Sequence, residues 1–404
     1  MEIKVEKNIY DMDLNDLIVM ASRANNPKRN FLFVSKILGK HIEVKPDVCK
    51  AMGYILASLI CRENSNTKDI VDSFKDKKSL KNLLKTEYEC EEKIAVLGFA
   101  ETATGLGMSV ASAIKDSFYL TTTRENIVDM KSILKFEEEH SHATTHKCYL
   151  ENLDRLISSE KIVLVDDEIT TGKSMLNIIR ELKKVTGINK YSILSVLDWR
   201  VKEYLDLYEK FKKENKVEIE VLSLISGSIE NSDKTIYYDE SKVNKLEEKI
   251  KINDLTGELE RKTYKVEENI SESYLADTGR FGTSYEKINS LEEKCERIAK
   301  KINIKIGEDK KVLVLGHGEN IYIPSRIASC LKGDIKFKST TRSPIYCSDK
   351  EGYPIAEKHS FTDRGTEYYF YNKSKIEKEF DCVILLVETD LDIKLTDNII
   401  IFKI

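Results

Sequence analysis

Three consecutive acidic side chains, Asp166, Asp167 and Glu168, stand shortly before a run of small, hydroxylated and basic residues, 170–174. That run, Thr-Thr-Gly-Lys-Ser, leads into the helix-like segment MLNIIRELKKV and offers backbone N–H groups, hydroxyls and an ammonium group to one point. Such a turn at the start of a helix suits a phosphate group. The neighbouring carboxylates accept hydrogen bonds from hydroxyl groups. Together they predict a ligand with one isolated phosphate and a nearby diol.

A nucleoside triphosphate fits this stretch less well. Gly172-Lys173-Ser174 resembles the end of a Walker A motif, but Asp167 stands where that motif has its first glycine. Adjacent carboxylates would also repel a polyphosphate. A ribose with a 5′-phosphate fits better, which is the logic of phosphoribosyl pyrophosphate (PRPP) binding. The alternative is a strand end that carries acids before an ordinary capped helix. The predicted PRPP-binding residues of this loop are Glu168, Ile169, Thr170, Thr171, Gly172, Lys173 and Ser174.

A buried strand must position this motif. Residues 162–165 form an unbroken apolar run, typical of a parallel strand that is covered on both faces. Open α/β sheets bind ligands at the carboxyl ends of such strands. Similar runs at 94–97, 117–123, 191–197 and 217–224 alternate with helical patterns. They predict an α/β fold with one doubly wound parallel sheet.

Two further strand ends carry candidate binding residues. The strand at 94–97 ends in Gly98 and is followed by Ala100, Glu101 and Thr102, where small residues let the backbone approach a ligand closely. The strand at 117–123 is followed by Arg124, whose guanidinium group suits bidentate contact with pyrophosphate or another acidic ligand.

The segment 130–149 is rich in metal-ligating residues: Glu137, Glu138, Glu139, His140, His142, His146 and Cys148. Zinc binding is one interpretation, although the spacing matches no standard site. A mobile loop that closes over the reacting centre is another, in which His140 and His142 stabilise a departing pyrophosphate or exclude water. A solvated polar hairpin is the third.

The chain contains an internal similarity. Residues 94–124 align without a gap on residues 312–342, with Val-Leu-Gly-x-x-Glu and Thr-Thr-Arg at matching positions. The second copy lacks the Thr-Gly-Lys-Ser turn, so we expect a degenerate repeat that binds a second ligand or serves as a structural cap. Its ligand candidates are Arg280, Gly316, His317, Gly318, Glu319, Thr341, Arg342, Ser343 and His359. The predicted domains are 1–230 and 266–404, joined by a charged connector at 231–265.

Composition limits the class of protein. The 404 residues suffice for two or three domains, and 33% charged with 41% hydrophobic residues is typical of globular proteins. A net charge of −4 argues against nucleic acid or an anionic membrane as the main partner. No targeting segment or long apolar run is present, so we expect a cytoplasmic protein. The eight cysteines form no Cys-x-x-Cys pair and are expected to be reduced and mostly buried.

Several of these motifs together resemble one family. The stretches LGKHIEV, GFAETATGLG, EEEHSHAT, VLVDDEITTGKS and STTRSPIY are similar to those of two-domain orotate-phosphoribosyltransferase-like proteins found with tellurium-resistance and stress-response gene clusters. Their C-terminal TRSP domain is named after the motif that is Thr341–Pro344 here.

The resemblance implies a type I phosphoribosyltransferase fold and transfer of a phosphoribosyl group from PRPP to an unknown acceptor, in the biosynthesis of a nucleoside-like metabolite. It implies that the loop 100–102 and Arg124 hold pyrophosphate, that Mg²⁺ binds at Asp166 and Asp167 partly through water, and that the protein is a homodimer. Related purine-salvage enzymes have an aspartate base where this chain has Thr170, which favours an amine or an already ionised acceptor. The alternative function is a non-enzymatic sensor of PRPP or nucleotides.

Overall fold

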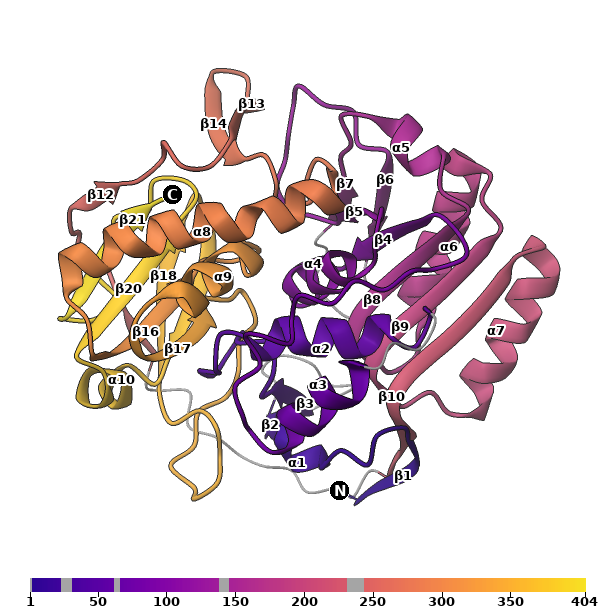
Figure 1. The fold of residues 1–404 in the computed structure, drawn as a ribbon, viewed down its shortest axis with the longest axis horizontal. Helices are drawn as coiled ribbons and strands as arrows, with labels where there is room; N and C mark the ends of the chain where they lie inside the picture. Colours follow the sequence, from indigo (N-terminus) through magenta and orange to yellow (C-terminus); the bar gives the residue numbers. More distant parts are fainter. Residues whose placement is uncertain (1, 23–30, 62–65, 138–144, 231–242) are drawn as a thin grey trace.

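The computed structural model describes residues 2–22, 31–61, 66–137, 145–230 and 243–404. Two α/β units lie side by side, with several helices between their sheets (Figure 1). The sheet of the first unit has the strand order β1, β10, β9, β8, β4, β5, β15. In that order the strands are Glu2–Asn8, Glu218–Glu230, Lys190–Asp198, Lys161–Ile169, Ile94–Gly98, Phe118–Thr121 and Thr283–Ser284. The five central strands are parallel, and the two edge strands are antiparallel.

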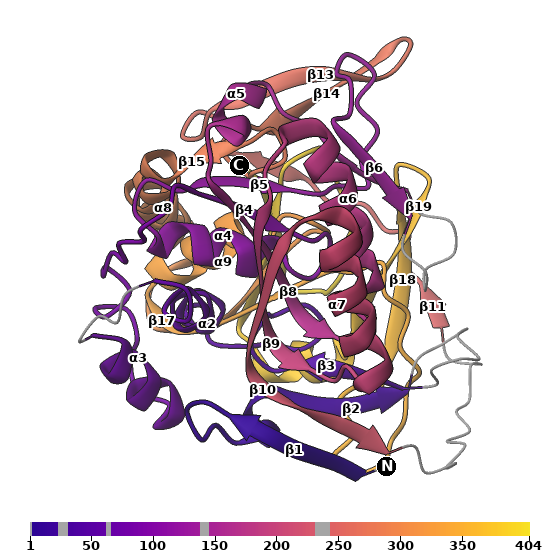
Figure 2. The same cartoon turned by 90° about the vertical axis from the view of Figure 1, so that its right-hand side faces the viewer.

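Helices cover both faces of this sheet (Figure 2). On one face lie α6 (Lys173–Thr186) and α7 (Lys202–Asn215), and on the other lie α2 (Val48–Ala57) and α4 (Thr104–Ala113). In β8, Ile162 and Leu164 pack with α6 and α7, whereas Val163 and Val165 pack with α2 and α4. Burial on both faces explains the unbroken apolar run, because side chains alternate along a strand. The predicted doubly wound α/β sheet is confirmed.

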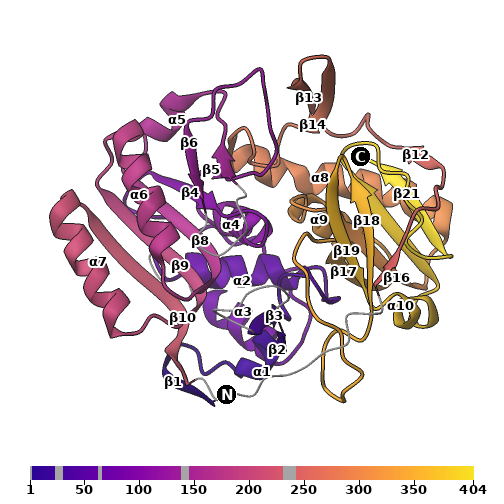
Figure 3. The same cartoon turned by 180° about the vertical axis from the view of Figure 1, so that it is seen from behind.

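The second unit contains a parallel five-stranded sheet in the order β12, β21, β20, β16, β17. These strands are Ile252–Asp254, Ile399–Lys403, Cys382–Val387, Lys310–Gly316 and Gly333–Ser339. A three-stranded sheet lies on the back of this unit (Figure 3) and contains β11 (Val243–Lys245), β18 (Lys358–Asp363) and β19 (Thr366–Tyr371). The helices of this unit are α8 (Tyr285–Ile306), α9 (Tyr322–Cys330) and α10 (Lys373–Glu379).

Smaller elements complete the described chain. Three two-stranded antiparallel sheets pair β2 (Ile18–Ser22) with β3 (Phe31–Ser35), β6 (Leu134–Glu137) with β7 (Thr145–Cys148), and β13 (Arg261–Glu267) with β14 (Ile270–Leu275). The short helices are α1 (Leu14–Leu17), α3 (Asn66–Lys75) and α5 (Leu153–Ile157). No helix in the described ranges is long and apolar enough to cross a membrane.

The two units share one hydrophobic core. A single cluster of buried side chains includes Leu106 of α4, Ile298 of α8 and Ile321, which directly precedes α9. The strand β15 also belongs to the C-terminal half of the chain, yet it pairs with β5 at the edge of the first sheet. Apolar packing and backbone pairing therefore join the two units.

A buried ion cluster lies in the same helix layer. Arg326 of α9 donates to Glu292 of α8 (Nε to Oε1, 2.9 Å) and to Asp47 at the start of α2 (Nη1 to Oδ1, 2.7 Å). Lys50 of α2 donates to the same Glu292 oxygen at 2.6 Å. Burial alone would raise the pKa of Glu292, but the two cations lower it to about 2. The carboxylate of Glu292 therefore stays charged at acidic pH, in the range in which an ordinary glutamate becomes protonated.

One expectation about the cysteines is wrong. The structure joins Cys61, which lies beyond the end of α2, to Cys90, which precedes β4, in a disulfide. The two residues are 29 positions apart, and the packing of the intervening segment, not a local spacing pattern, brings them together. The other six cysteines are free, and four of them are buried: Cys49, Cys148, Cys295 and Cys382.

Candidate active site

The predicted order of strand, turn and helix is present at β8, but the strand is longer than predicted. It pairs with β9 as far as Ile169, so Asp166, Asp167 and Glu168 lie on the last strand residues and are half-buried. The backbone N–H of Asp167 donates to Oδ1 of Asp166 at 2.9 Å. The chain then turns at residues 170–172, and α6 begins at Lys173. The three acids and the start of α6 thus meet at one edge of the sheet.

Gly172 is the N-cap residue of α6, and its φ of 68° lies in the left-handed region that favours glycine. The hydroxyl of Tyr208 on α7 donates to the Gly172 carbonyl oxygen at 2.8 Å. Any Cβ at position 172 would lie 2.2 Å from that hydroxyl oxygen. Arg200 lies over the Tyr208 ring, 4.4 Å from its centroid, and forms a bidentate pair with Asp198. Tyr208, held in place by Arg200 and Asp198, therefore fixes the position of the turn at residues 170–172.

The loop after β4 forms a second part of the site. The backbone N–H of Ala100 donates to the Thr122 hydroxyl at 2.8 Å, and Lys40 Nζ donates to the Thr102 hydroxyl at 2.7 Å. The peptide bond between Ala100 and Glu101 is cis. Glu101 is only 2% exposed. Burial alone would raise its pKa, but Lys40, Arg124 and Arg342 hold the pKa of Glu101 below its ordinary value.

Arg124 lies beside this loop. Its Nη1 is 3.5 Å from Oε2 of Glu101, and its Nε donates to Nε2 of His146 at 3.4 Å. Nδ1 of the same imidazole lies 3.3 Å from the Thr122 hydroxyl. His146 therefore braces the arginine and the strand end from inside the protein.

The rest of the histidine-rich segment is only partly described. His140 and His142, predicted to act on the leaving group, lie outside the described residues, as do Glu138 and Glu139. Cys148 is buried, and its thiol lies 3.7 Å from the Thr121 carbonyl oxygen. Within the described part of the chain, no group of three His, Cys, Asp or Glu side chains is arranged to hold a metal ion.

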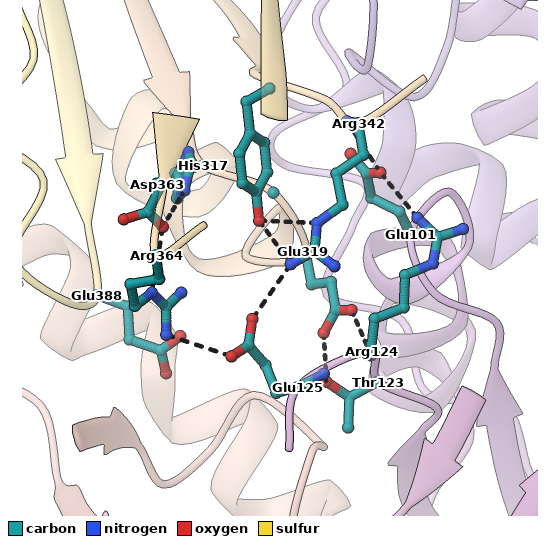
Figure 4. A network of polar contacts seen from close by, with 12 residues as sticks. Glu101, Thr123, Arg124, Glu125, His317, Glu319, Arg342, Asp363, Arg364 and Glu388 are labelled. Carbon is teal, nitrogen blue, oxygen red and sulfur yellow. Dashed lines mark hydrogen bonds and ion pairs between the residues drawn. The ribbon is translucent and has the colours of Figure 1, made fainter. Parts of the chain in front are cut away.

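Residues of the second unit reach the first site (Figure 4). The Thr123 hydroxyl and the Arg124 backbone N–H donate to the two carboxylate oxygens of Glu319, at 2.6 and 2.8 Å. The backbone N–H of Arg342 donates to Oε2 of Glu101 at 3.4 Å. Its guanidinium group contacts Glu125 at 3.3 Å. The TRSP motif thus lies directly against the loop after β4.

The other candidates of the second unit make contacts within that unit. His317 lies 3.2 Å from an Asp363 carboxylate oxygen and 2.8 Å from the Thr340 hydroxyl. Arg280 forms a buried bidentate pair with Glu388, at 3.0 and 3.1 Å.

The remaining candidates lie at strand ends or in the loops beside them. Gly316 ends β16, Gly318 packs against Tyr368, Thr341 pairs with Tyr369, and the Ser343 N–H donates to the Thr341 hydroxyl. His359 lies on β18 with Nε2 3.6 Å from Glu357.

Sequence reasoning did not single out Lys40, Glu125 or Tyr208, and it considered His146 only as a zinc ligand. Lys40 lies within the LGKHIEV stretch, but nothing in its spacing relates it to Thr102, which is 62 residues away. Tyr208 occupies an ordinary buried helix position. Only the folded arrangement shows that these side chains support the two loops.

The comparisons with known proteins agree with this architecture. Residues 17–228, more than half of the chain, match a family profile described as phosphoribosyl transferase (PRTase_2), and residues 277–402 match the TRSP domain that lies C-terminal to it. The chain belongs to this phosphoribosyltransferase family. A search of curated proteins finds none that matches.

Among solved structures, the chain is similar to adenine phosphoribosyltransferases. That of Trypanosoma brucei, in complex with AMP, pyrophosphate and ribose-5-phosphate, is 14% identical with a TM-score of 0.32 and covers 56% of this chain and 85% of its own. The enzyme from Leishmania donovani is 14% identical with a TM-score of 0.30, covering 55% and 85%. The enzyme from Giardia lamblia, complexed with 9-deazaadenine, is 14% identical with a TM-score of 0.27, covering 53% and 96%.

Proposed function

We propose that the protein transfers the phosphoribosyl group of PRPP to a base or amine acceptor and releases pyrophosphate. The main supporting observation is the meeting of three features at one sheet edge. They are the acids at the end of β8, the glycine turn before α6, and the loop 100–102 with Arg124 beside it. In this proposal the turn 170–174 anchors the 5′-phosphate, because it combines a helix N-terminus with hydroxyls and an ammonium group.

The acids and the arginine have complementary roles. Asp166 and Asp167 hold the ribose diol and stabilise positive charge as the ring becomes oxocarbenium-like. Arg124 and the loop 100–102 stabilise the negative charge that develops on the departing pyrophosphate. Fixed charges of this kind require no reorganisation during the reaction and supply much of a transition-state stabilisation.

Mg²⁺ fits the donor set at Asp166 and Asp167. Both residues are half-buried and not fully enclosed, and Mg²⁺ uses few protein oxygens while it keeps several waters. When bound, the ion supplies positive charge to the pyrophosphate and the ribose hydroxyls. The protein side chains named above would still orient the ribose and the pyrophosphate.

Thr170 limits the choice of acceptor. Its hydroxyl cannot serve as the carboxylate base that would deprotonate a purine, so we propose an amine or an acceptor that is already ionised. A place in the biosynthesis of a nucleoside-like metabolite, the link to tellurium-resistance and stress-response clusters, and a homodimer remain proposals that rest on the family resemblance.

Pyrophosphate release tests the proposal. The purified chain, incubated with PRPP, Mg²⁺ and a pool of small metabolites, is expected to release pyrophosphate in step with consumption of one pool component, identified by mass spectrometry. Binding of PRPP without any release across pools of bases, nucleosides and amines would instead favour the sensor. No binding of PRPP would contradict both the transferase and a PRPP sensor.

Gly172→Ala is expected to weaken PRPP binding at least tenfold. The substitution combines a left-handed backbone with a Cβ that meets the Tyr208 hydroxyl, so the turn must move. Gly187 provides a matched control, since it ends the same helix with φ of 74° and a Cβ added there would meet no atom within 4 Å. Gly187→Ala should cost about 1 kcal/mol of stability and leave PRPP binding, measured by calorimetry, unchanged. Equal PRPP affinities for the two variants would contradict the assigned role of the turn.

A further inference from the structure

The strand–loop–helix–strand units around Glu101 and Glu319 have their elements at corresponding positions along the chain. β4 ends at Gly98 and β16 at Gly316, α4 begins at Thr104 and α9 at Tyr322, and β5 ends at Thr121 and β17 at Ser339. Each position of the second set lies 218 residues after its counterpart in the first. The same offset relates the two glutamates, and it relates Thr123-Arg124 to Thr341-Arg342.

Individual hydrogen bonds recur at the same offset. The Thr122 N–H donates to the Gly98 carbonyl at 3.0 Å, as the Thr340 N–H does to Gly316 at 3.1 Å. Likewise, the N–H groups of Ala100 and Gly318 donate to the hydroxyls of Thr122 and Thr340, at 2.8 and 3.4 Å. Recurrence of these contacts as well as of the elements argues that the ends of β4 and β16 are anchored to the next strand in the same way.

The two loops also exchange their carboxylates (Figure 4). Glu319 of the second unit accepts from the hydroxyl and N–H of Thr123-Arg124 in the first, at 2.6 and 2.8 Å. Glu101 of the first unit accepts from the Arg342 N–H at 3.4 Å. A reciprocal exchange of this kind is the property of an isologous, twofold interface. Here it lies within one chain.

Packing between helices of the two units holds the two loops together. Ile321 lies so close to α4 that a Cβ on Gly105 would be 2.8 Å from its Cγ2 atom. The exchange is therefore anchored by packed helices, and the carboxylates are not free to separate independently.

We infer that the C-terminal unit serves as an in-chain partner subunit, and that Glu319 is a positioning residue for the pyrophosphate end of the site. Glu319 holds the Thr123 hydroxyl and the backbone N–H of Arg124, so it fixes the point from which the guanidinium group extends. Arg342 contributes from the same side by contacting both Glu101 and Glu125. The assignment to pyrophosphate rests on the proposed function, whereas the carboxylate exchange does not.

The second unit does not repeat the phosphate turn. Its strand β20 ends before Glu388-Thr389-Asp390, and Glu388 is engaged by Arg280. The paired loops would therefore serve a single site, in which the second unit holds the pyrophosphate loop of the first.

Comparing PRPP with ribose 5-phosphate tests this inference in the full chain. Glu319→Ala is expected to weaken binding of PRPP with Mg²⁺ at least tenfold, but binding of ribose 5-phosphate less than twofold, because that ligand lacks pyrophosphate. Glu319→Gln keeps one acceptor oxygen and should therefore recover part of the PRPP affinity that Glu319→Ala loses. If Glu319→Ala does not fold, the same comparison of ligands is made with Glu319→Gln. The control Glu367→Ala removes an exposed carboxylate of the same unit and should change neither affinity. Equal losses for both ligands, or no loss, would overturn the positioning role.

The exchange itself has a separate test. Thermal unfolding of Glu319→Ala, Thr123→Val and the double variant should show that the Glu319 substitution lowers the midpoint less once Thr123 is already replaced. Additive shifts would overturn the exchange. Should the unaltered protein fail to bind PRPP, the proposed function falls while the unfolding cycle still decides whether the two loops are coupled.

Discussion

Asp166→Asn is expected to lower the rate of pyrophosphate release at least about a hundredfold without destabilising the fold, the size of loss seen when one preorganised charge or dipole is removed from an active site. Asparagine keeps an oxygen that can accept from the Asp167 N–H, which donates to the Asp166 carboxylate at 2.9 Å. The substitution therefore removes the charge and keeps this hydrogen bond. Because three carboxylates stand in sequence there, removing one relieves repulsion and should not lower the free energy of unfolding.

The measurement pairs kinetics with unfolding. Turnover with PRPP and Mg²⁺ should fall, while the urea midpoint stays the same or rises slightly. Asp206→Asn, which changes an exposed aspartate of α7, is the control and should alter neither quantity. Unchanged turnover in Asp166→Asn would remove this carboxylate from the mechanism.

Arg326→Met is expected to cost about 3–5 kcal/mol of unfolding free energy, since breaking a buried ion cluster leaves its other charges uncompensated. The variant leaves Glu292 with Lys50 as its remaining cationic partner and removes the hydrogen bond to Asp47. Urea unfolding measures the loss. Lys332→Met removes an exposed pair with Glu308 and should cost less than about 1 kcal/mol. A similar effect of both substitutions would show that the buried cluster does not stabilise docking of the units.

The same cluster predicts a pH dependence. Glu292 has a folded pKa of about 2, below the value near 4.5 of an unperturbed glutamate. A group with a lowered folded pKa contributes stability above its unfolded pKa and loses that contribution as pH falls through the folded value. Stability should therefore decrease between roughly pH 4.5 and pH 2, and this decrease should be smaller in Arg326→Met. Identical acid profiles of the two proteins would contradict the low pKa of Glu292.

The sequence allowed the first sheet to be predicted because its strands carry a signal that is local. Runs such as 162–165 are continuous and apolar, since helices cover both faces, and the turn residues that follow mark their ends. The extent of β8 was not predictable in the same way. Its last residues are acidic, and only pairing with β9 keeps Asp166, Asp167 and Glu168 in extended conformation.

Residue spacing in the sequence could not predict contacts between segments that are far apart along the chain. The Cys61–Cys90 disulfide has no local motif, and His146 was a zinc candidate until the fold placed it between Thr122 and Arg124. The internal similarity identified Glu319 and Arg342 as candidates. It could not show that their partners belong to the other unit, because that depends on how α4, α8 and α9 pack.

The short strand β15 has a practical consequence. Its residues Thr283 and Ser284 cover the outer edge of β5, although they come from the far half of the chain. A fragment that stops at residue 276 would leave the edge of β5 exposed. The unpaired backbone N–H and C=O groups of an exposed edge strand can pair with strands of other molecules. Aggregation of such a fragment would then reflect the missing edge strand together with the apolar surface that α8 and α9 normally cover, and it would not count against the chemistry of the intact enzyme.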